Sequence, residues 1–500
     1  MLKLKISPKI DISSTTAREN VEPPAATEHI LSPSTQRSQA AVGINRLPHE
    51  ILSQIFVMWA HDDEDGPWMA AAVCGYWRKV VLATSQAWGR ITLRLEPAKE
   101  MDPEWCIEEE DLEMAASPRN KRRPLGLWLE RADGAELSLH LTINPLCPGL
   151  EEEIWSIMNG IKERTQCLRR ITLLVESVFL TETILEIISV QMPECRLQHL
   201  EIVLSEKRVP VELRDLHSEG RLITRFWDFA PPAETLVFRG CVPPSGQSSS
   251  ASHVHTLVVE DVERAVPLHM FPNIRHLEMK SVQIIRLSSP DPPPFQFLET
   301  LSIHSMSTVH CALWMTKLKA PNLTHLSIGN YGKQELHDLW SKDPESKWAD
   351  IMHEFGSAFT CFVRNSPSVG SLHLRRSPID DIHFLEILEE LPGLHELSID
   401  TLLIGTPAMR GLTPGPPGKS KGRRVLCPRL QHLHIENCAS IQKTSLLRLL
   451  EARYKERNRC APIERLTIAD CEGLEGIDTE VLSLVDPAAV TVKILREEEP

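Results

Sequence analysis

The sequence predicts an α/β protein in which a short N-terminal helical module precedes an irregular solenoid of repeats, with a parallel sheet on the concave face. Two observations predict this class. Near residue 50, apolar residues recur at helical spacing, and from residue 168 one short apolar pattern recurs eleven times. The length of 500 residues also exceeds what a single compact core holds.

Composition narrows the class of protein. Apolar residues make up 42% and charged residues 24% of the chain, as in ordinary soluble globular proteins. A formal net charge of −14 argues against broad binding of nucleic acid or anionic membranes, so neither is predicted as a partner. No apolar run is long enough to span a bilayer. The 12 cysteines include no Cys-x-x-Cys pair, which favours reduced thiols and a cytoplasmic and/or nuclear location.

Changes in pattern along the chain predict its domains. Residues 1–43 are rich in Ser, Thr, Pro and Ala and are predicted to be a disordered tail. The helical module is expected at 44–91, followed by a linker and first irregular repeat at 92–167. The repeat domain is predicted at 168–475, and residues 476–500 form the C-terminal end.

The first helix of the module is predicted from residue 48 onward. Leu52, Ile55, Phe56 and Trp59 sit at i, i+3, i+4 and i+7, which places them on one helix face. Pro48 suits the first helical position, where its missing N–H costs nothing.

A second helical stretch is predicted after an acidic loop. Ala70, Val73, Cys74, Trp77 and Val81 continue the helical spacing. A module of about 45 residues rarely buries enough surface to stand alone. We therefore expect it either to lean on its neighbour or to offer its apolar face to a partner.

The repeated pattern is apolar-x-x-apolar-x-apolar. Its eleven occurrences begin at residues 168, 197, 233, 254, 274, 298, 323, 369, 394, 430 and 463. Six of the ten intervals lie within the 20–29 residues of a leucine-rich repeat, and the longer intervals hold insertions. Helix-like segments at 151–166, 380–390 and 443–456 lie between occurrences, so strands and helices alternate as in a curved parallel solenoid. Loops are predicted at 243–252, 290–294 and 405–424.

The third and fifth positions of each occurrence are expected on the concave face, because side chains alternate along a strand. These positions are mostly polar and rich in histidine. The candidate substrate-binding residues are His199, His276, His325, His373, His432 and His434. Simple solvation of a half-exposed strand is the alternative. A metal site is not predicted, because these histidines come mostly from non-adjacent repeats and lack a completing cluster.

Three segments of the module resemble a known family. Residues 47–56, Leu-Pro-His-Glu-Ile-Leu-Ser-Gln-Ile-Phe, look like the opening of an F-box. Residues 73–81, Val-Cys-Gly-Tyr-Trp-Arg-Lys-Val-Val, resemble that family's second conserved helix, and residues 84–88, Thr-Ser-Gln-Ala-Trp, its closing stretch. The chain is therefore similar to F-box proteins with leucine-rich repeats, in particular fungal members.

The resemblance implies a substrate-recognition adaptor of a Skp–cullin–F-box ubiquitin ligase. The module would dock on a Skp-family adaptor joined to a cullin and a RING subunit, while the repeats hold a protein substrate, here unknown. Such a subunit contributes proximity and no catalytic group. The docking residues implied by position are Leu47, Pro48, Ile51, Ile55, Val73 and Trp77. Three alternatives stay open: a simple helical cap, a repeat scaffold acting outside ubiquitination, and an adaptor-bound F-box protein acting outside it.

Enzyme motifs are not found. The pair His353-Glu354 lacks the second histidine of a zinc-protease helix. Phosphate-binding loops, a nucleophile elbow and a dinucleotide glycine fingerprint are also missing. The sequence therefore predicts a non-catalytic protein without cofactor or metal.

Overall fold

A computed structural model of the chain describes most of the predicted module and repeats. The described residues are 47–63, 65–95, 125–143, 149–205, 222–243, 250–262, 266–282, 295–329, 346–400, 404–415, 425–474, 477 and 491–495. The chain divides into two compact units, Met1–Pro48 and His49–Pro500. Only Leu47 and Pro48 of the first unit are described, so the tail predicted at 1–43 lies outside these ranges.

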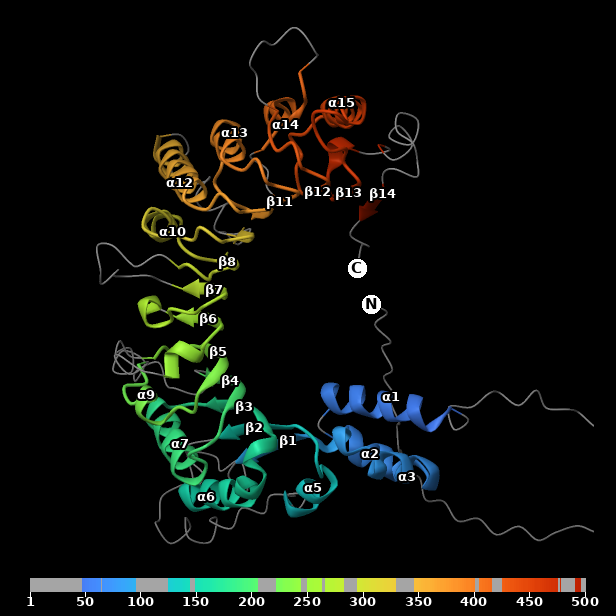
Figure 1. Cartoon of the computed structure of the whole chain (residues 1–500), viewed down its shortest axis with the longest axis vertical. Coiled ribbons are helices and arrows are strands. Elements are labelled where there is room, and N and C mark those ends of the chain that lie inside the picture. Colours follow the sequence, from blue (N-terminus) through green and yellow to red (C-terminus); the bar gives the residue numbers. More distant parts are fainter. Residues whose placement is uncertain are drawn as a thin grey trace, which may run out of the picture. The chain divides into compact units, whose positions relative to one another are not determined.

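The helical module contains three α-helices and a 3-10 turn. These are α1 (His49–Asp62), α2 (Gly66–Val73), α3 (Gly75–Ala83) and η2 (Ser85–Trp88). The single second helix predicted through Val81 is thus two helices, separated at Cys74, whose backbone is extended (φ −159°, ψ 168°). The Cys74 thiol accepts a hydrogen bond from the Trp77 amide at 3.4 Å and so caps α3. α1 lies against α2 and α3 (Figure 1).

One parallel sheet runs through the rest of the described chain. It has 14 strands in sequence order, β1 to β14. The strands are β1 (Arg90–Leu95), β2 (Leu137–Ile143), β3 (Leu168–Val175), β4 (Leu197–Leu204), β5 (Ala233–Arg239), β6 (Thr256–Val262), β7 (His276–Val282), β8 (Thr300–His304), β9 (His325–Gly329), β10 (Ser371–Arg375), β11 (Glu396–Asp400), β12 (His432–Glu436), β13 (Arg465–Ala469) and β14 (Thr491–Leu495). All eleven predicted occurrences of the repeat pattern coincide with β3 to β13. The predicted α/β solenoid with a parallel sheet is confirmed.

The sheet is longer than the predicted repeat domain at both ends. β1 and β2 precede residue 168, and β14 lies within the predicted C-terminal end. The physical reason is visible in β2, which alternates strictly: Leu137, Leu139, Leu141 and Ile143 are buried, with polar residues between them. This period-2 pattern forms a strand without matching the repeat spacing.

Helices line one face of the strand ladder (Figure 1). They are α5 (Leu125–Arg131), α6 (Leu150–Ile161), α7 (Val178–Gln191), α9 (Phe226–Phe229), α10 (Thr308–Met315), α12 (Ser346–Arg364), α13 (Asp381–Glu389), α14 (Thr406–Leu412) and α15 (Lys443–Lys455). Short 3-10 turns add η4 (Lys162–Cys167), η6 (Ser250–His253), η7 (Leu268–Met270) and η8 (Glu472–Leu474). The helix-like segments predicted at 151–166, 380–390 and 443–456 are confirmed by α6 with η4, α13 and α15. We call the sheet face opposite the helices the open face.

The prediction of a loop at 405–424 is wrong for the first part of this range. Residues 406–412 form α14, because Ala408, Met409 and Leu412 bury an apolar side of a short helix. Residues 416–418 of the loop's Pro-Gly-Pro-Pro-Gly core at 414–418 lie outside the described residues, as do 290–294 and most of 243–252. Among the described residues, none of the helices has the length and apolarity needed to cross a bilayer.

Candidate functional site

The helical module has a small core of its own. Leu52 and Phe56 are buried on one side of α1, and the ring of Phe56 lies 5.2 Å from that of Trp77. Trp77 is only 8% exposed, so this predicted docking residue packs inside the module. Its side chain packs between α1 and α3, and its docking role stays a prediction.

A second side of α1 is apolar and exposed. Ile51 is 43% exposed, Ile55 is half-buried and Met58 is 67% exposed. Their spacing of i, i+4 and i+7 places them on one face of α1, away from Leu52 and Phe56. On α2, Met69 is 49% and Val73 is 56% exposed, again at i and i+4. We call these two helix faces together, with Ile51, Ile55, Met58, Met69 and Val73, the α1–α2 apolar surface.

Part of this surface was not predicted. Ile51, Ile55 and Val73 belong to the docking set implied by the F-box resemblance, whereas Met58 and Met69 do not. Their helical spacing with Ile51 and Val73 is the signal in the sequence that finds them. Leu47 is half-buried and Pro48 exposed, and both lie in the first unit. Their docking role stays a prediction.

Aromatic side chains join the module to the first repeat. Trp68 of α2 meets Trp88 edge-on at 4.9 Å and Trp128 of α5 at 5.8 Å. The guanidinium of Arg131 lies 4.5 Å from the ring centres of both Trp68 and Trp88. The Trp88 indole N–H also donates to the Val81 carbonyl at 2.8 Å. These rigid rings bury apolar area and fix one geometry between α2, η2 and α5.

The backbone reinforces the same junction. The Gly89 carbonyl accepts a hydrogen bond from the Ser138 amide of β2 at 2.8 Å. The Arg90 side chain of β1 donates to the His61 carbonyl at the end of α1. The module is therefore held at the first edge of the sheet by residues other than the α1–α2 apolar surface.

The open face carries two rows of side chains in register. Strand pairing places the third positions next to one another, as in Arg170 with His199 and Glu396 with His432. The fifth positions pair in the same way, as in Ser398 with His434. Residues at the first, fourth and sixth positions, such as Leu168, Ile171 and Leu173, are buried towards the helices. The predicted burial of the first, fourth and sixth positions is confirmed, whereas Ser371 and Val237, at a third and a fifth position, are buried as well.

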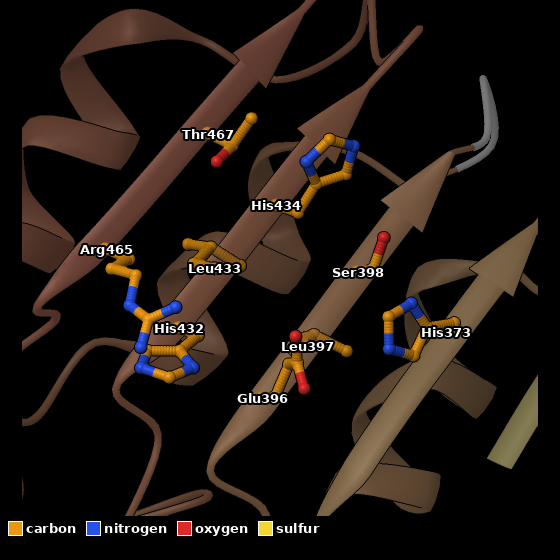
Figure 2. A pocket seen from close by; sticks show the side chains of 9 residues that line it. All are labelled: His373, Glu396, Leu397, Ser398, His432, Leu433, His434, Arg465 and Thr467. Atoms are coloured by element: carbon orange, nitrogen blue, oxygen red, sulfur yellow. The ribbon is translucent and has the colours of Figure 1, made fainter. Parts of the chain in front are cut away.

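A hollow of about 360 Å³ opens on this face across β10 to β13. It is lined by His373, Glu396, Leu397, Ser398, His432, Leu433, His434, Arg465 and Thr467, whose polar groups come from neighbouring strands (Figure 2). Three of the six candidate histidines meet there. His325 lies on the adjacent strand β9, whereas His199 and His276 stand on β4 and β7, far along the ladder.

Hydrogen bonds and burial set the chemistry of the hollow. The Ser371 hydroxyl donates to Glu396 Oε2 at 2.9 Å and lies 3.0 Å from His373 Nε2. Burial lowers the pKa of His373, and the nearby Glu396 carboxylate only partly opposes this effect. His373 is therefore neutral near physiological pH. In the described ranges, no three His, Cys, Asp or Glu side chains are placed to hold a metal ion. The hollow suits hydrogen bonding to a polar partner.

Comparisons with known proteins find similarity only among solved structures. No protein-family model matches the sequence. Nor does any curated protein. A crystal structure of the Rad7 and Elc1 complex in yeast is 12% identical, covers 89% of this chain and 92% of that chain, and has a TM-score of 0.34. The crystal structure of a Bacteroides fragilis protein is 11% identical, covers 60% of this chain and 76% of that one, and has a TM-score of 0.30. What the chain does is therefore inferred from its own residues.

Proposed function

We propose that this protein is the non-catalytic, substrate-recognition adaptor of a Skp–cullin–F-box ubiquitin ligase. The α1–α2 apolar surface would bind a Skp-family adaptor, and the open face of the sheet would bind a protein substrate. The observation that carries the proposal is the exposure of Ile51, Met58 and Val73 on helices whose sequence resembles an F-box.

Exposed apolar side chains in this number call for a partner. Burying one such side chain fully contributes roughly 1.5–3 kcal/mol. Interface energy is commonly concentrated in a few clustered apolar anchors, and the α1–α2 apolar surface supplies five within two short helices. A module that merely capped the repeats would bury these residues against them. The contacts with the repeats instead use Trp68, Trp88 and Arg131.

The junction gives the proposal a mechanical basis. A ligase adaptor works by holding a substrate at a fixed place relative to the rest of the complex. The edge-to-face rings of Trp68, Trp88 and Trp128, with the Gly89–Ser138 hydrogen bond, hold the module directly against the sheet. A protein bound on the open face would therefore be held at a defined position relative to the docked adaptor.

Binding of the intact chain to a purified Skp-family adaptor tests the proposal. The double variant Ile51→Asp with Val73→Asp places charges on the proposed surface, and we expect at least about a hundredfold weaker binding. The matched control is Phe179→Asp, which adds a charge at a 74% exposed apolar residue of α7 and should bind as the wild type does. Equal thermal unfolding of the variants excludes misfolding. Unchanged affinity of the double variant would overturn the docking surface.

Affinity purification from cells separates the alternatives. Recovery of the adaptor together with a cullin, and accumulation of a bound protein when residues 47–91 are deleted, is the outcome expected for a ligase subunit. Recovery of the adaptor without a cullin would indicate a role outside ubiquitination. Recovery of neither would leave a repeat scaffold.

A further inference from the structure

Two histidines meet between the neighbouring helices α12 and α13, away from the surfaces described above (Figure 1). His353 Nδ1 of α12 lies 3.2 Å from His383 Nε2 of α13, and the two ring centres are 5.2 Å apart. The His353 side of this pair is exposed, whereas His383 is only 8% exposed. The pair therefore joins a ring held inside the protein to a ring that solvent reaches.

The separation of the two ring nitrogens suits a shared metal ion. Zn²⁺ binds imidazole nitrogen at about 2.0–2.1 Å in tetrahedral sites, which places two such nitrogens about 3.3–3.4 Å apart. The observed 3.2 Å between His353 Nδ1 and His383 Nε2 is close to this spacing. Binding of one ion by both nitrogens thus requires only a small shift of the exposed His353 ring.

The carboxylate of Asp380 prepares His383 to act as a ligand. Asp380 Oδ1 lies 2.9 Å from His383 Nδ1 and also accepts a hydrogen bond from the His383 amide at 2.8 Å. Because a carboxylate accepts hydrogen bonds, Nδ1 carries the proton and Nε2 keeps its lone pair. Metal-binding histidines almost always have such a partner on the second nitrogen, since it fixes the ring and raises the basicity of the ligand.

Packing against α12 holds the His383 ring in place. A Cβ added to Gly356 of α12 would lie 2.4 Å from His383 Cγ, so the ring fills the space that a side chain would need. Glycine is unfavourable inside a helix, and this close approach explains its presence there. A ring that is already fixed loses little conformational freedom when it binds a ligand.

A plain hydrogen bond between the two imidazoles is the alternative to a metal site. In that arrangement His353 Nδ1–H donates to the lone pair of His383 Nε2. Metal binding requires only that this proton moves to His353 Nε2, because a neutral imidazole carries its proton on either nitrogen. The neighbouring charges favour a cation, since α13 has no Lys or Arg and Asp350 lies one turn before His353 on α12.

We propose that His353 and His383 together bind one divalent cation of the Zn²⁺ class, for which imidazole is a suitable ligand. Within the described ranges no third His, Cys, Asp or Glu joins them, so water fills the remaining positions. The ion links α12 to α13, the helices that precede and follow β10 in sequence. Because β10 carries His373 of the hollow, the ion stabilises the repeats that form it. The inference is independent of the proposed function.

Isothermal titration of the full-length chain with Zn²⁺, with the thiols kept reduced, tests the proposal. The wild type should bind one Zn²⁺ that His353→Gln binds at least about tenfold more weakly, because only one of two linked ligands is left. His269→Gln, which replaces an exposed histidine of η7, is the matched control and should bind as the wild type does. Asp380→Asn keeps a residue type that caps helices but removes the carboxylate, and should weaken binding about tenfold.

The chain has 20 histidines and 12 cysteines, so the difference between variants carries the result. Equal titrations of the wild type and His353→Gln would overturn the proposal, as would an equal loss of binding in His269→Gln. Thermal unfolding gives a second readout: Zn²⁺ should raise the midpoint of the wild type and His269→Gln more than that of His353→Gln. An equal rise in all three would also overturn it. Should His353→Gln unfold earlier than the wild type without Zn²⁺, Asp380→Asn decides the point, and unchanged Zn²⁺ affinity in that variant would overturn the proposal.

Discussion

The guanidinium of Arg131 lies 4.5 Å from the ring centre of Trp88. Trp88 ends the helical module and Arg131 ends α5 of the first repeat, so this cation–π contact crosses the junction. Burial lowers the pKa of Arg131, and the flanking rings of Trp68 and Trp88 offset part of that cost by attracting the cation. A charged side chain thus contributes to a junction that is otherwise built from aromatic rings.

Replacing Arg131 tests how much this cation–π contact stabilises the protein. Arg131→Met replaces the aliphatic part of the side chain but removes the charged guanidinium, and we expect the free energy of unfolding to fall by about 1–2 kcal/mol. Urea titration followed by tryptophan fluorescence measures the change, since three of the rings involved are tryptophans. Arg410→Met, at an exposed position of α14, is the control and should change stability by less than about 0.5 kcal/mol. Equal losses of stability in both variants would show that the Arg131 contact does not stabilise the junction.

Gly89 is the tightest point of the same junction. A Cβ added there would lie 2.5 Å from the Glu136 carbonyl oxygen, which belongs to the backbone and cannot rotate away. Gly89→Ala should therefore destabilise the protein by about 1–3 kcal/mol and weaken the protection of the Ser138 amide against hydrogen exchange. Gly75→Ala is the control, because its Cβ meets nothing within 4 Å and alanine favours helix α3. A stable Gly89→Ala protein with a protected Ser138 amide would contradict the close approach.

The repeat strands were predictable because their cause is local. The spacing of Leu168, Ile171 and Leu173 predicts which side chains of the strand enter the core. The same spacing recurs in every strand from β3 to β13. β2 lies in the segment predicted as a linker and first irregular repeat, and it lacks that spacing because its apolar residues alternate strictly. The division of the second module helix at Cys74 escaped because it depends on one backbone conformation and a thiol cap.

The functional surfaces were only partly predictable, because they depend on which residues meet. The F-box resemblance implies a docking role for Trp77, and the structure adds that its ring packs 5.2 Å from that of Phe56, a contact that the sequence spacing does not reveal. The six histidines were chosen by position in the repeat, yet only His373, His432 and His434 share a hollow.

Arg453 of α15 is a buried cation that holds the last repeats together. Its side chain is 0% exposed and donates to the carbonyls of Leu426 at 2.8 Å and Cys427 at 3.2 Å, with longer bonds to Leu412, Leu430 and Ala461. Arg453→Met fills similar space but leaves these oxygens without a donor, so we expect a loss of about 3–5 kcal/mol. Arg448→Met, exposed on the same helix, should be nearly neutral. Chemical denaturation of the two variants side by side decides the point.

Thiol reactivity should follow burial. Burial raises the pKa of Cys195 to about 11 and of Cys427 to about 12, and it also raises that of Cys311, whereas Cys361 is exposed on α12. Because the thiolate is the reactive form, iodoacetamide at about pH 8 should label Cys361 before Cys195, Cys311 and Cys427. Labelling of Cys195, Cys311 and Cys427 should require denaturant. Peptide mass spectrometry over time gives the order, and early labelling of Cys311 in the folded protein would contradict its burial.

As the pH falls, protonation of His140 should lower the stability of the fold before protonation of carboxylates does. Its pKa of about 4 in the folded protein lies below the usual value near 6.5, because burial disfavours the charged ring. Between these two pKa values, His140 is protonated in the unfolded chain but not in the folded protein. The stability that neutral His140 contributes is therefore fully present above about pH 6.5 and is lost as the pH falls towards 4. Glu201 has a lowered pKa, so the stability that its carboxylate contributes persists through the upper part of this pH range.

Thermal unfolding at about pH 7 and pH 5.5 measures this effect. The loss of stability between the two pH values should be smaller for His140→Gln than for the wild type. His276→Gln, at an exposed position of β7, should lose as much stability as the wild type does. An identical loss in His140→Gln and wild type would mean that His140 does not carry this pH dependence.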